Sequence, residues 1–189
     1  MHTNPLSKPY PLMKKLFLMA LVCALAITAK PVQAQNTLIK ANLLTPLFQT
    51  GSFYVEQVIK EDKSVQLGVF FTQIADVSGY GITPEYRVYL SDTPAPDGFY
   101  VAPFLSFMKF TIEDKDPDYG YKGKSTNFGG GLIAGRQWIF KEKVSFDIFI
   151  GPEYTNGNIT VERGTEEQID DAGYNGWLPR GGIALGLRF

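Results

Sequence analysis

Three aspartates stand at alternate positions of one segment. Of all the carboxylates in this sequence, these have the spacing most similar to that of a metal site. They are Asp114, Asp116 and Asp118, within "EDKDPDYG". Carboxylate oxygens at this spacing are typical of calcium-binding loops. An EF-hand requires glycine at its sixth position and an acid at its twelfth, but Tyr119 and Ser125 stand there. We therefore expect either weak divalent-cation binding that bridges to phosphate groups, or a solvated acidic loop.

Two other stretches have compositions that suggest chemistry. The acidic run "VERGTEEQIDDAG" (161–173) has the same two interpretations as the three aspartates. The glycine-rich "NFGGGLIAGRQ" (127–137) lacks the Gly-Lys-Ser/Thr ending with which a phosphate-binding loop holds phosphate and magnesium. Its glycines are better suited to bends or close packing in a strand.

The N-terminal region has the pattern of a secretory signal peptide. Lys14 and Lys15 precede an apolar run over residues 16–28, which is short for a membrane-spanning helix. Small residues follow, so we predict cleavage after Ala34, and Met13 is a plausible start. The alternative is a buried or anchoring helix. Lipidation of Cys23 is disfavoured because Val22, not a small residue, precedes it.

Removal of residues 1–34 changes the chemistry that remains. The only cysteine and the only histidine, Cys23 and His2, lie in this segment, as do four of the 18 basic residues and none of the 19 acidic ones. The remaining chain, 35–189, has no thiol, imidazole or disulfide, and its acidic balance argues against nucleic-acid binding. Without a histidine, the remaining chain cannot carry out histidine-dependent lipid-modifying chemistry. We therefore expect neither an enzyme nor a bound cofactor. A hydrolase that uses carboxylates alone remains as an alternative.

Period-two alternation of apolar and polar residues recurs along the remaining chain, and no sustained helical repeat does. In the final stretch, Ile183, Leu185, Leu187 and Phe189 alternate with small or charged residues. This pattern predicts strands at 38–48, 52–61, 64–74, 81–91, 98–112, 127–140, 143–156 and 177–189.

The connections between these strands fall into two sets. The second, fourth and sixth are short and polar, whereas the third, fifth and seventh include "ADVSGYG", "EDKDPDYGYKGKST" and "NGNITVERGTEEQIDDAGYNG". In an up-and-down meander, alternate connections lie at the same end. Long loops at one end and tight turns at the other predict an all-β, eight-stranded antiparallel transmembrane barrel, with both mature termini in the periplasm.

Nine charged residues share one face of the predicted strands: Lys40, Glu56, Glu85, Arg87, Arg136, Asp147, Glu153, Arg180 and Arg188. A cation on the lipid-facing side costs about 2–4 kcal/mol at midplane, so nine such groups would exceed a domain's stability of about 5–15 kcal/mol. In a bilayer they must point inward. We expect a structural network of ion pairs there, with a proton or ion path or an acid–base pair as alternatives.

Aromatic residues and the final strand supply further membrane signals. Trp138, Phe140 and Phe189 cluster toward the turn end, and Phe128, Tyr154 and Trp177 toward the loop end, as in interfacial girdles. The alternation of Ile183, Leu185, Leu187 and Phe189 resembles the signal that the outer-membrane barrel assembly machinery recognises. We expect these four side chains to face lipid.

The segment "GITPEYRVYLSDTPAPDGFYVAPFL", with "IKANLL" before it and "GGGLIAGRQWIF" and "FDIFIGPEY" after it, resembles a family of short outer-membrane barrels of Bacteroidetes. That family is a domain of unknown function, and the resemblance spans most of residues 36–189. The architecture is also similar to the membrane half of OmpA-type proteins. The resemblance implies an eight-stranded barrel in the cell envelope and carries no functional residues.

Together these patterns predict an integral, non-enzymatic outer-membrane barrel of a Gram-negative envelope. Its expected partners are outer-membrane lipids, lipopolysaccharide and the assembly machinery, and its expected role is structural, adhesive or in small-ligand contact. Two alternatives remain open: a narrow channel for small or apolar solutes, and a soluble secreted lipocalin-like binder, whose alternating strands would face apolar residues inward.

Overall fold

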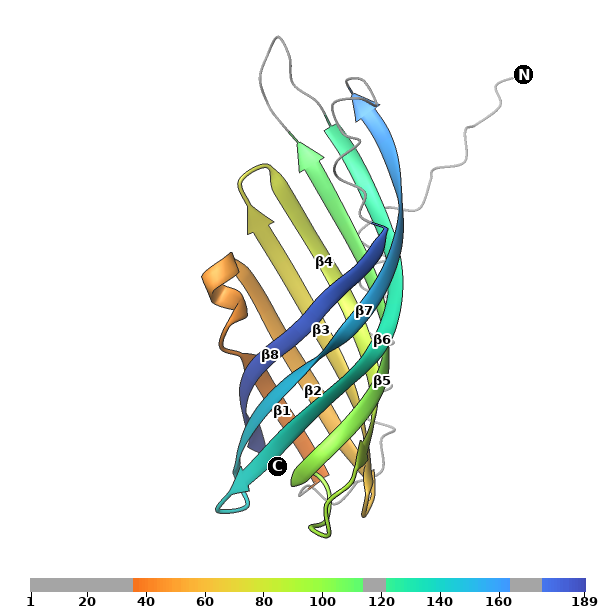
Figure 1. Cartoon of the computed structure of the whole chain (residues 1–189). Coiled ribbons are helices and arrows are strands. Elements are labelled where there is room, and N and C mark those ends of the chain that lie inside the picture. The colour runs from red at the N-terminus through yellow and green to blue at the C-terminus, as the bar shows by residue number, and fades with distance from the viewer. Residues whose placement is uncertain (1–35, 114–121, 164–174) are drawn as a thin grey trace, which may run out of the picture. The chain divides into compact units, whose positions relative to one another are not determined.

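Eight antiparallel strands close into a barrel in which each strand pairs with its sequence neighbours and β8 pairs with β1 (Figure 1). The structure is a computed structural model that describes residues 36–113, 122–163 and 175–189. The strands are β1 (Thr37–Asn42), β2 (Thr50–Lys60), β3 (Lys63–Ile74), β4 (Val77–Tyr89), β5 (Gly98–Glu113), β6 (Lys122–Phe140), β7 (Val144–Arg163) and β8 (Gly176–Arg188). The predicted fold class is confirmed. The predicted signal peptide and its cleavage point lie outside the described residues.

The alternation seen in the sequence becomes an alternation of burial along each strand. In β2, Ser52, Tyr54 and Glu56 are buried, whereas Phe53 and Val55 between them are about half exposed. This follows from strand geometry, because successive side chains point to opposite faces of the sheet. In a closed barrel the buried face is the interior.

The first connection differs from the prediction. β1 ends at Asn42, not at residue 48, and the 3-10 helix η2 (Thr45–Phe48) follows it. Pro46 lies near the start of η2, where its missing N–H costs little, and it has no N–H to donate to a neighbouring strand. β1 is consequently the shortest strand, with six residues.

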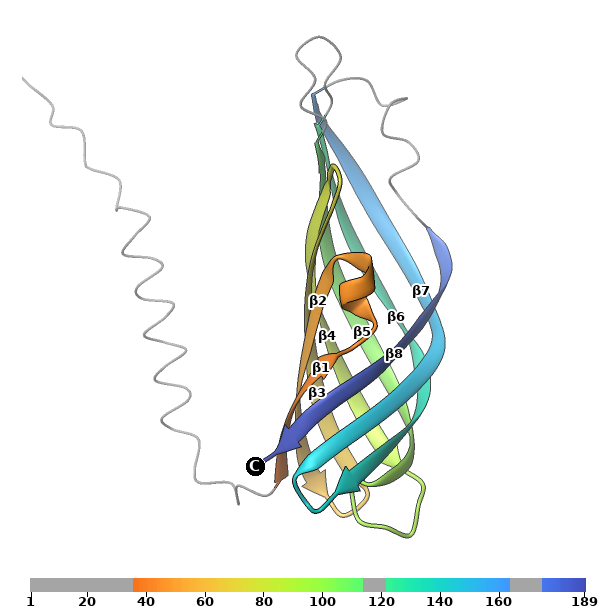
Figure 2. The ribbon, with the colours of Figure 1, turned by 90° about the vertical axis from the view of Figure 1, so that its left-hand side faces the viewer.

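The loop end also differs in detail. The third connection is a tight turn at Ala75 and Asp76, where Ala75 has φ 47°, and β4 begins at Val77 rather than 81. β6 starts earlier and β7 ends later than predicted, so both rise well above η2 (Figure 2). With 19 and 20 residues, they exceed the roughly 9–11 residues that a membrane-crossing strand needs.

The opposite end of the barrel carries the remaining connections and both ends of the described barrel. Phe189 donates its N–H to the Thr37 carbonyl over 2.8 Å, so the start of β1 and the end of β8 lie together. The β4–β5 connection, residues 90–97, packs against this end, where Ala95 is buried and donates its N–H to the Glu61 carbonyl over 2.6 Å. Within the described residues, no helix is long and apolar enough to cross a bilayer.

Candidate functional site

The outer wall of the barrel is apolar. Large exposed side chains on it include Ile39, Phe53, Leu67, Phe71, Ile82, Leu105, Phe107, Leu132, Ile150, Leu185 and Leu187. Ring pairs lie toward both ends: Phe107 with Phe128 and Tyr154 with Trp177 at the loop end, and Trp138 with Phe146 at the turn end. This is the arrangement of an apolar band between aromatic girdles.

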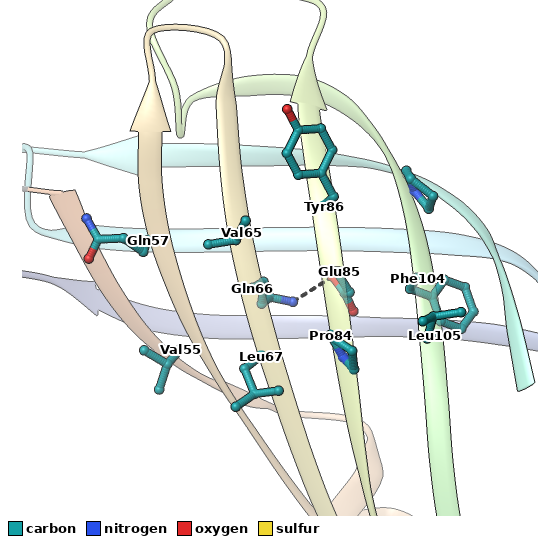
Figure 3. Close-up of a pocket in the computed structure, with 11 residues that line it drawn as sticks. Val55, Gln57, Val65, Gln66, Leu67, Pro84, Glu85, Tyr86, Phe104 and Leu105 are labelled. Carbon is teal, nitrogen blue, oxygen red and sulfur yellow. Dashed lines mark hydrogen bonds between the residues drawn. The ribbon is translucent and has the colours of Figure 1, made fainter. Parts of the chain in front are cut away.

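A hollow of about 750 Å³ interrupts this wall between β2 and β5, lined by residues such as Val55, Leu67 and Leu105 (Figure 3). Pro84 on β4 and Pro103 on β5 also line it. Around these prolines the β4–β5 pairings are interrupted, leaving Glu85↔Phe104 between two gaps. Proline has no N–H for a sheet ladder, which accounts for the gaps.

Polar and charged side chains fill the interior toward the turn end. Lys40 lies at the centre of one group, and its Nζ donates to Glu56 Oε2 at 2.7 Å, Gln137 Oε1 at 2.7 Å and Asp147 Oδ2 at 3.0 Å. Four different strands supply these residues. Lys40, Glu56 and Asp147 are at most 1% exposed, so the ion pairs are shielded from water.

Arg87 is the second buried cation and joins two parts of this network. Its Nη1 donates to Asp147 Oδ2 at 2.8 Å, and its Nη2 donates to Glu85 Oε2 at 3.0 Å. The guanidinium also stacks over the Tyr100 ring, with Cζ 4.3 Å from the centroid. Planar guanidinium groups suit such buried, multiply bonded positions.

Glu85 links this group to a second one nearer the loop end. Its Oε1 accepts from Arg180 Nη2 at 3.2 Å, and Arg180 Nη1 lies 3.8 Å from Glu153 Oε2. Ser106 donates to Glu153 Oε1. Glu85 and Arg87, both predicted to face inward, are therefore packing partners within a larger network.

The central carboxylates have several donors each. Ser64 and Tyr89 donate to one oxygen of Glu56, while Lys40 and Gln137 donate to the other. Asp147 accepts from Tyr100, Lys40 and Arg87, and Glu85 accepts from Gln66, Arg87 and Arg180. Buried ions need such compensation, because an uncompensated buried charge costs several kcal/mol. The arrangement suits a rigid structural core.

The β4–β5 connection adds a cover to this core. Pro96 is fully buried, and its carbonyl accepts from Gln137 Nε2 at 2.9 Å. Gln137 also contacts Lys40 and Glu56, so one side chain joins the ion-pair network to the connection that crosses the turn end. The interior is therefore filled at this end by side chains of the strands and by Ala95 and Pro96 of the connection.

Arg136 differs from the prediction that it faces inward. It pairs with the exposed Phe99 and Ile148, and its Cζ lies 4.5 Å from the centroid of the Phe99 ring on the outer face. Because strand residues alternate, its neighbour Gln137 faces the interior instead. The mainly small and apolar sequence before Arg136 gives a weak phase signal, and this explains the one-residue error.

Arg188 and the four residues of the predicted assembly signal lie in the C-terminal half of β8 and directly after it. Arg188 pairs with the buried Leu38 at the turn end and shares the inward parity of Ala184 and Gly186. The outward set of the proposed assembly signal follows the opposite parity: Ile183 is partly exposed, and Leu185, Leu187 and Phe189 are 45–53% exposed.

Several residues of the network were not singled out from the sequence. They are Gln66, Ser64, Tyr89, Tyr100 and Gln137. The available signal is that each of them lies on the polar face of its strand. This alone does not distinguish a residue that belongs to the network from one that only fills space in the interior. The acidic candidates Asp114, Asp116 and Asp118 lie outside the described residues, and the described part of the chain contains no cluster of potential metal ligands.

Comparison with known proteins identifies a family. The model for the family of proteins of unknown function DUF3575 matches residues 17–161. Among solved structures, the N-terminal β-barrel domain of OprF from Pseudomonas aeruginosa is similar, with 16% identity, 83% of this chain and 100% of that chain covered, and a TM-score of 0.46. No curated protein matches the sequence significantly. Since the family match spans most of the chain, this protein belongs to the DUF3575 family.

Proposed function

We propose that this protein is an integral outer-membrane β-barrel of the bacterial envelope, with a structural or adhesive role and no enzymatic activity. The observation that carries the proposal is the distribution of polarity: charged groups are buried inside while large apolar groups are exposed outside. Ile150 is 69% exposed and Phe71 is 56% exposed, whereas Glu56, Arg87 and Asp147 have no exposure.

A soluble lipocalin-like barrel would require the opposite distribution. Soluble monomers rarely expose large continuous apolar patches, and this wall presents apolar side chains on all eight strands. In a bilayer the same side chains contact lipid without cost. The predicted signal peptide and the aromatic pairs at both ends of the wall support an outer-membrane location. The longer predicted connections at the end opposite the termini support periplasmic termini.

A closed interior favours a scaffold over a channel. The ion-pair network and the cover formed by residues 90–97 occupy the turn end, and eight-stranded barrels have an interior just wide enough for side chains to fill it. We propose that the filled part of the barrel anchors the longer strands β6 and β7, which extend toward lipopolysaccharide and the cell exterior. β8 and Phe189 would supply the contact with the barrel assembly machinery.

Two measurements test this function. Purified chain 35–189 should fold into detergent micelles and lipid vesicles and show heat-modifiable migration on a detergent gel. A chain that instead folds as a soluble monomer without detergent would contradict the membrane assignment. Folded barrel in a planar bilayer should show no unit conductance, and discrete conductance steps would favour the narrow-channel alternative.

A further inference from the structure

The barrel wall is incompletely paired where it closes. β1 and β8 pair over only five positions, from Leu38↔Arg188 to Asn42↔Ala184, followed by one hydrogen bond from Leu43 N–H to the Ile183 carbonyl at 2.7 Å. β8 begins at Gly176, well before this pairing. Among the described residues, the part of β8 from Gly176 to Gly182 pairs only with β7. We call the boundary between Thr45 of η2 and Gly181 of β8 the seam.

The sequence of β8 is suited to an unpaired edge at the seam. Successive residues of a strand direct their backbone groups to alternate neighbours, and Ile183 directs its carbonyl toward β1. Gly181 and Pro179 therefore direct theirs to the same side. Proline has no N–H and is tolerated at sheet edges, so Pro179 loses no ladder bond here.

A pocket of about 180 Å³ lies behind the seam. Its lining includes Asn42 and Thr45 from the β1–η2 side of the seam and Arg180 and Gly181 from the β8 side. The interior rings of Tyr54 and Phe149 also line it. Because residues from both sides of the seam form its wall, the pocket connects the seam with the interior. Its volume corresponds to about six water molecules, at roughly 30 Å³ each.

Two buried polar atoms of the pocket residues have no hydrogen-bond partner in the described protein, Thr45 Oγ1 and Arg180 Nε. Arg180 Nε–H is an obligate donor. The Tyr54 hydroxyl accepts from Asn42 Nδ2 at 3.1 Å, which leaves its own proton available to another acceptor. The remaining Arg180 nitrogens face Glu85 and Glu153, so the pocket carries no net positive charge that would select a multiply charged anion.

The seam lies at the level of the apolar wall. Trp177 and Tyr154 form a ring pair on the loop side of it, and exposed Leu185 lies on the turn side. If the barrel lies in the outer membrane, as proposed above, the seam faces the lipid hydrocarbon. An amphiphile in that leaflet can then place its head in the pocket while its chain stays in the bilayer.

We propose that the pocket behind the β1–β8 seam binds the carbonyl head of an aliphatic amphiphile that enters laterally from the membrane. The head is a carboxyl or an ester, which supplies an acceptor to Arg180 Nε and to the hydroxyls of Thr45 and Tyr54. A pocket of this size encloses a head group and the first carbons of a chain, but not a whole lipid.

Equilibrium binding to the folded chain 35–189 in maltoside micelles tests the proposal. The probes are dodecanoate, methyl dodecanoate and dodecane, each radiolabelled. We expect saturable binding of at least one carbonyl-bearing probe and none of dodecane. Tighter binding of the ester would point to lipid esters as a source, whereas tighter binding of the acid would point to free fatty acid. Absence of saturable binding by both, or equal binding of dodecane, would overturn the proposal.

Variants locate the site. Arg180→Met should weaken binding about tenfold through loss of a charge-assisted hydrogen bond. Since Arg180 also contacts Glu85, Thr45→Val provides a variant that removes only an unpartnered hydroxyl, and we expect it to weaken binding severalfold. Gly181→Leu places a bulky group at the seam, and its matched control is Gly130→Leu, also on the outer face but distant from the seam.

Gly181→Leu should reduce probe binding and Gly130→Leu should not. Wild-type affinity in both Thr45→Val and Gly181→Leu would overturn the assignment of the site. Heat-modifiable migration is recorded for every variant. A folded barrel that binds no probe contradicts this inference alone, whereas a chain that folds without detergent contradicts the membrane function itself.

Discussion

Lys40 on β1 and Asp147 on β7 lie 107 residues apart in the sequence, yet the Lys40 ammonium donates to Asp147 Oδ2 over 3.0 Å. β8 lies between these strands, so the ion pair passes over the inner face of the closing strand. Gly186 makes this possible, because a Cβ there would collide with Lys40 Cγ and with the Ile39 carbonyl. A buried ion pair thus joins the first strand to the seventh across the closure.

Removal of the buried ammonium should strongly destabilise the barrel. Lys40→Met removes one of the two buried cations that Glu56 and Asp147 share, the other being Arg87, and breaking a buried pair typically costs about 3–5 kcal/mol. The measurement is urea-induced unfolding of the barrel in lipid vesicles.

The matched control for this change is Lys124→Met. Lys124 pairs with Glu162 near the loop end, where the two side chains are 54% and 37% exposed. An exposed pair contributes about 0–1 kcal/mol, so this variant should unfold almost like the wild type. Equal losses of unfolding free energy in the two variants would show that the buried network has no special role.

The same substitution should have a small effect on stability at Arg136 and a large one at Arg87. Arg136→Leu replaces an outward cation, which stacks on Phe99, by a residue typical of the wall, so we expect a change within about 1 kcal/mol. Arg87→Leu should cost about 3–5 kcal/mol because Glu85 and Asp147 lose a buried partner. Vesicle unfolding of both variants checks this, and a large loss for Arg136→Leu would place its side chain inside.

The fold could be predicted from the sequence because strand period and loop order leave few alternatives. β7 and β8 alternate strongly, and their inward and outward residues follow from that pattern. β6 is different: Gly129, Gly130, Gly131, Ala134 and Gly135 give little contrast between faces, so the parity of Arg136 could not be fixed. The seam depends on where β1 ends, and the sequence pattern predicted a strand up to residue 48 whereas β1 ends at Asn42.

The candidate site was predictable only in composition. Charge on one face required an inward network, but its contacts depend on barrel register, which pairs Lys40 with Glu56 and Asp147 across strands that are not all adjacent. Sequence spacing contains no information on such contacts. The role of Gln137, which joins the network to the Pro96 carbonyl, depends in addition on the path of residues 90–97.

Gly186→Ala should test the close approach at the closing strand. The added methyl group points inward toward Lys40, and overpacking of this kind costs about 1–3 kcal/mol. Gly181→Ala is the control, because a Cβ there lies 3.2 Å from its nearest neighbour, the Phe149 carbonyl oxygen, and points to the outer face. Denaturant titration should show a loss in unfolding free energy for the first variant and almost none for the second.

Phe189 should be important for assembly in the cell rather than for stability. We expect Phe189→Ala, or deletion of Phe189, to lower the amount of barrel in the outer membrane while export to the periplasm continues. We expect this because the alternating pattern of Ile183, Leu185, Leu187 and Phe189 resembles the signal of the assembly machinery. The measurements are cell fractionation and heat-modifiable migration.

Phe140→Ala is the control that separates recognition from hydrophobic contact. Phe140 ends β6 at the turn end and is 53% exposed, the same fraction as Phe189, so both substitutions remove equally exposed rings. Both purified variants should fold equally well into vesicles, because neither ring packs in the interior. If Phe140→Ala lowers outer-membrane levels as much as Phe189→Ala does, loss of lipid contact explains the defect and Phe189 has no specific part in assembly.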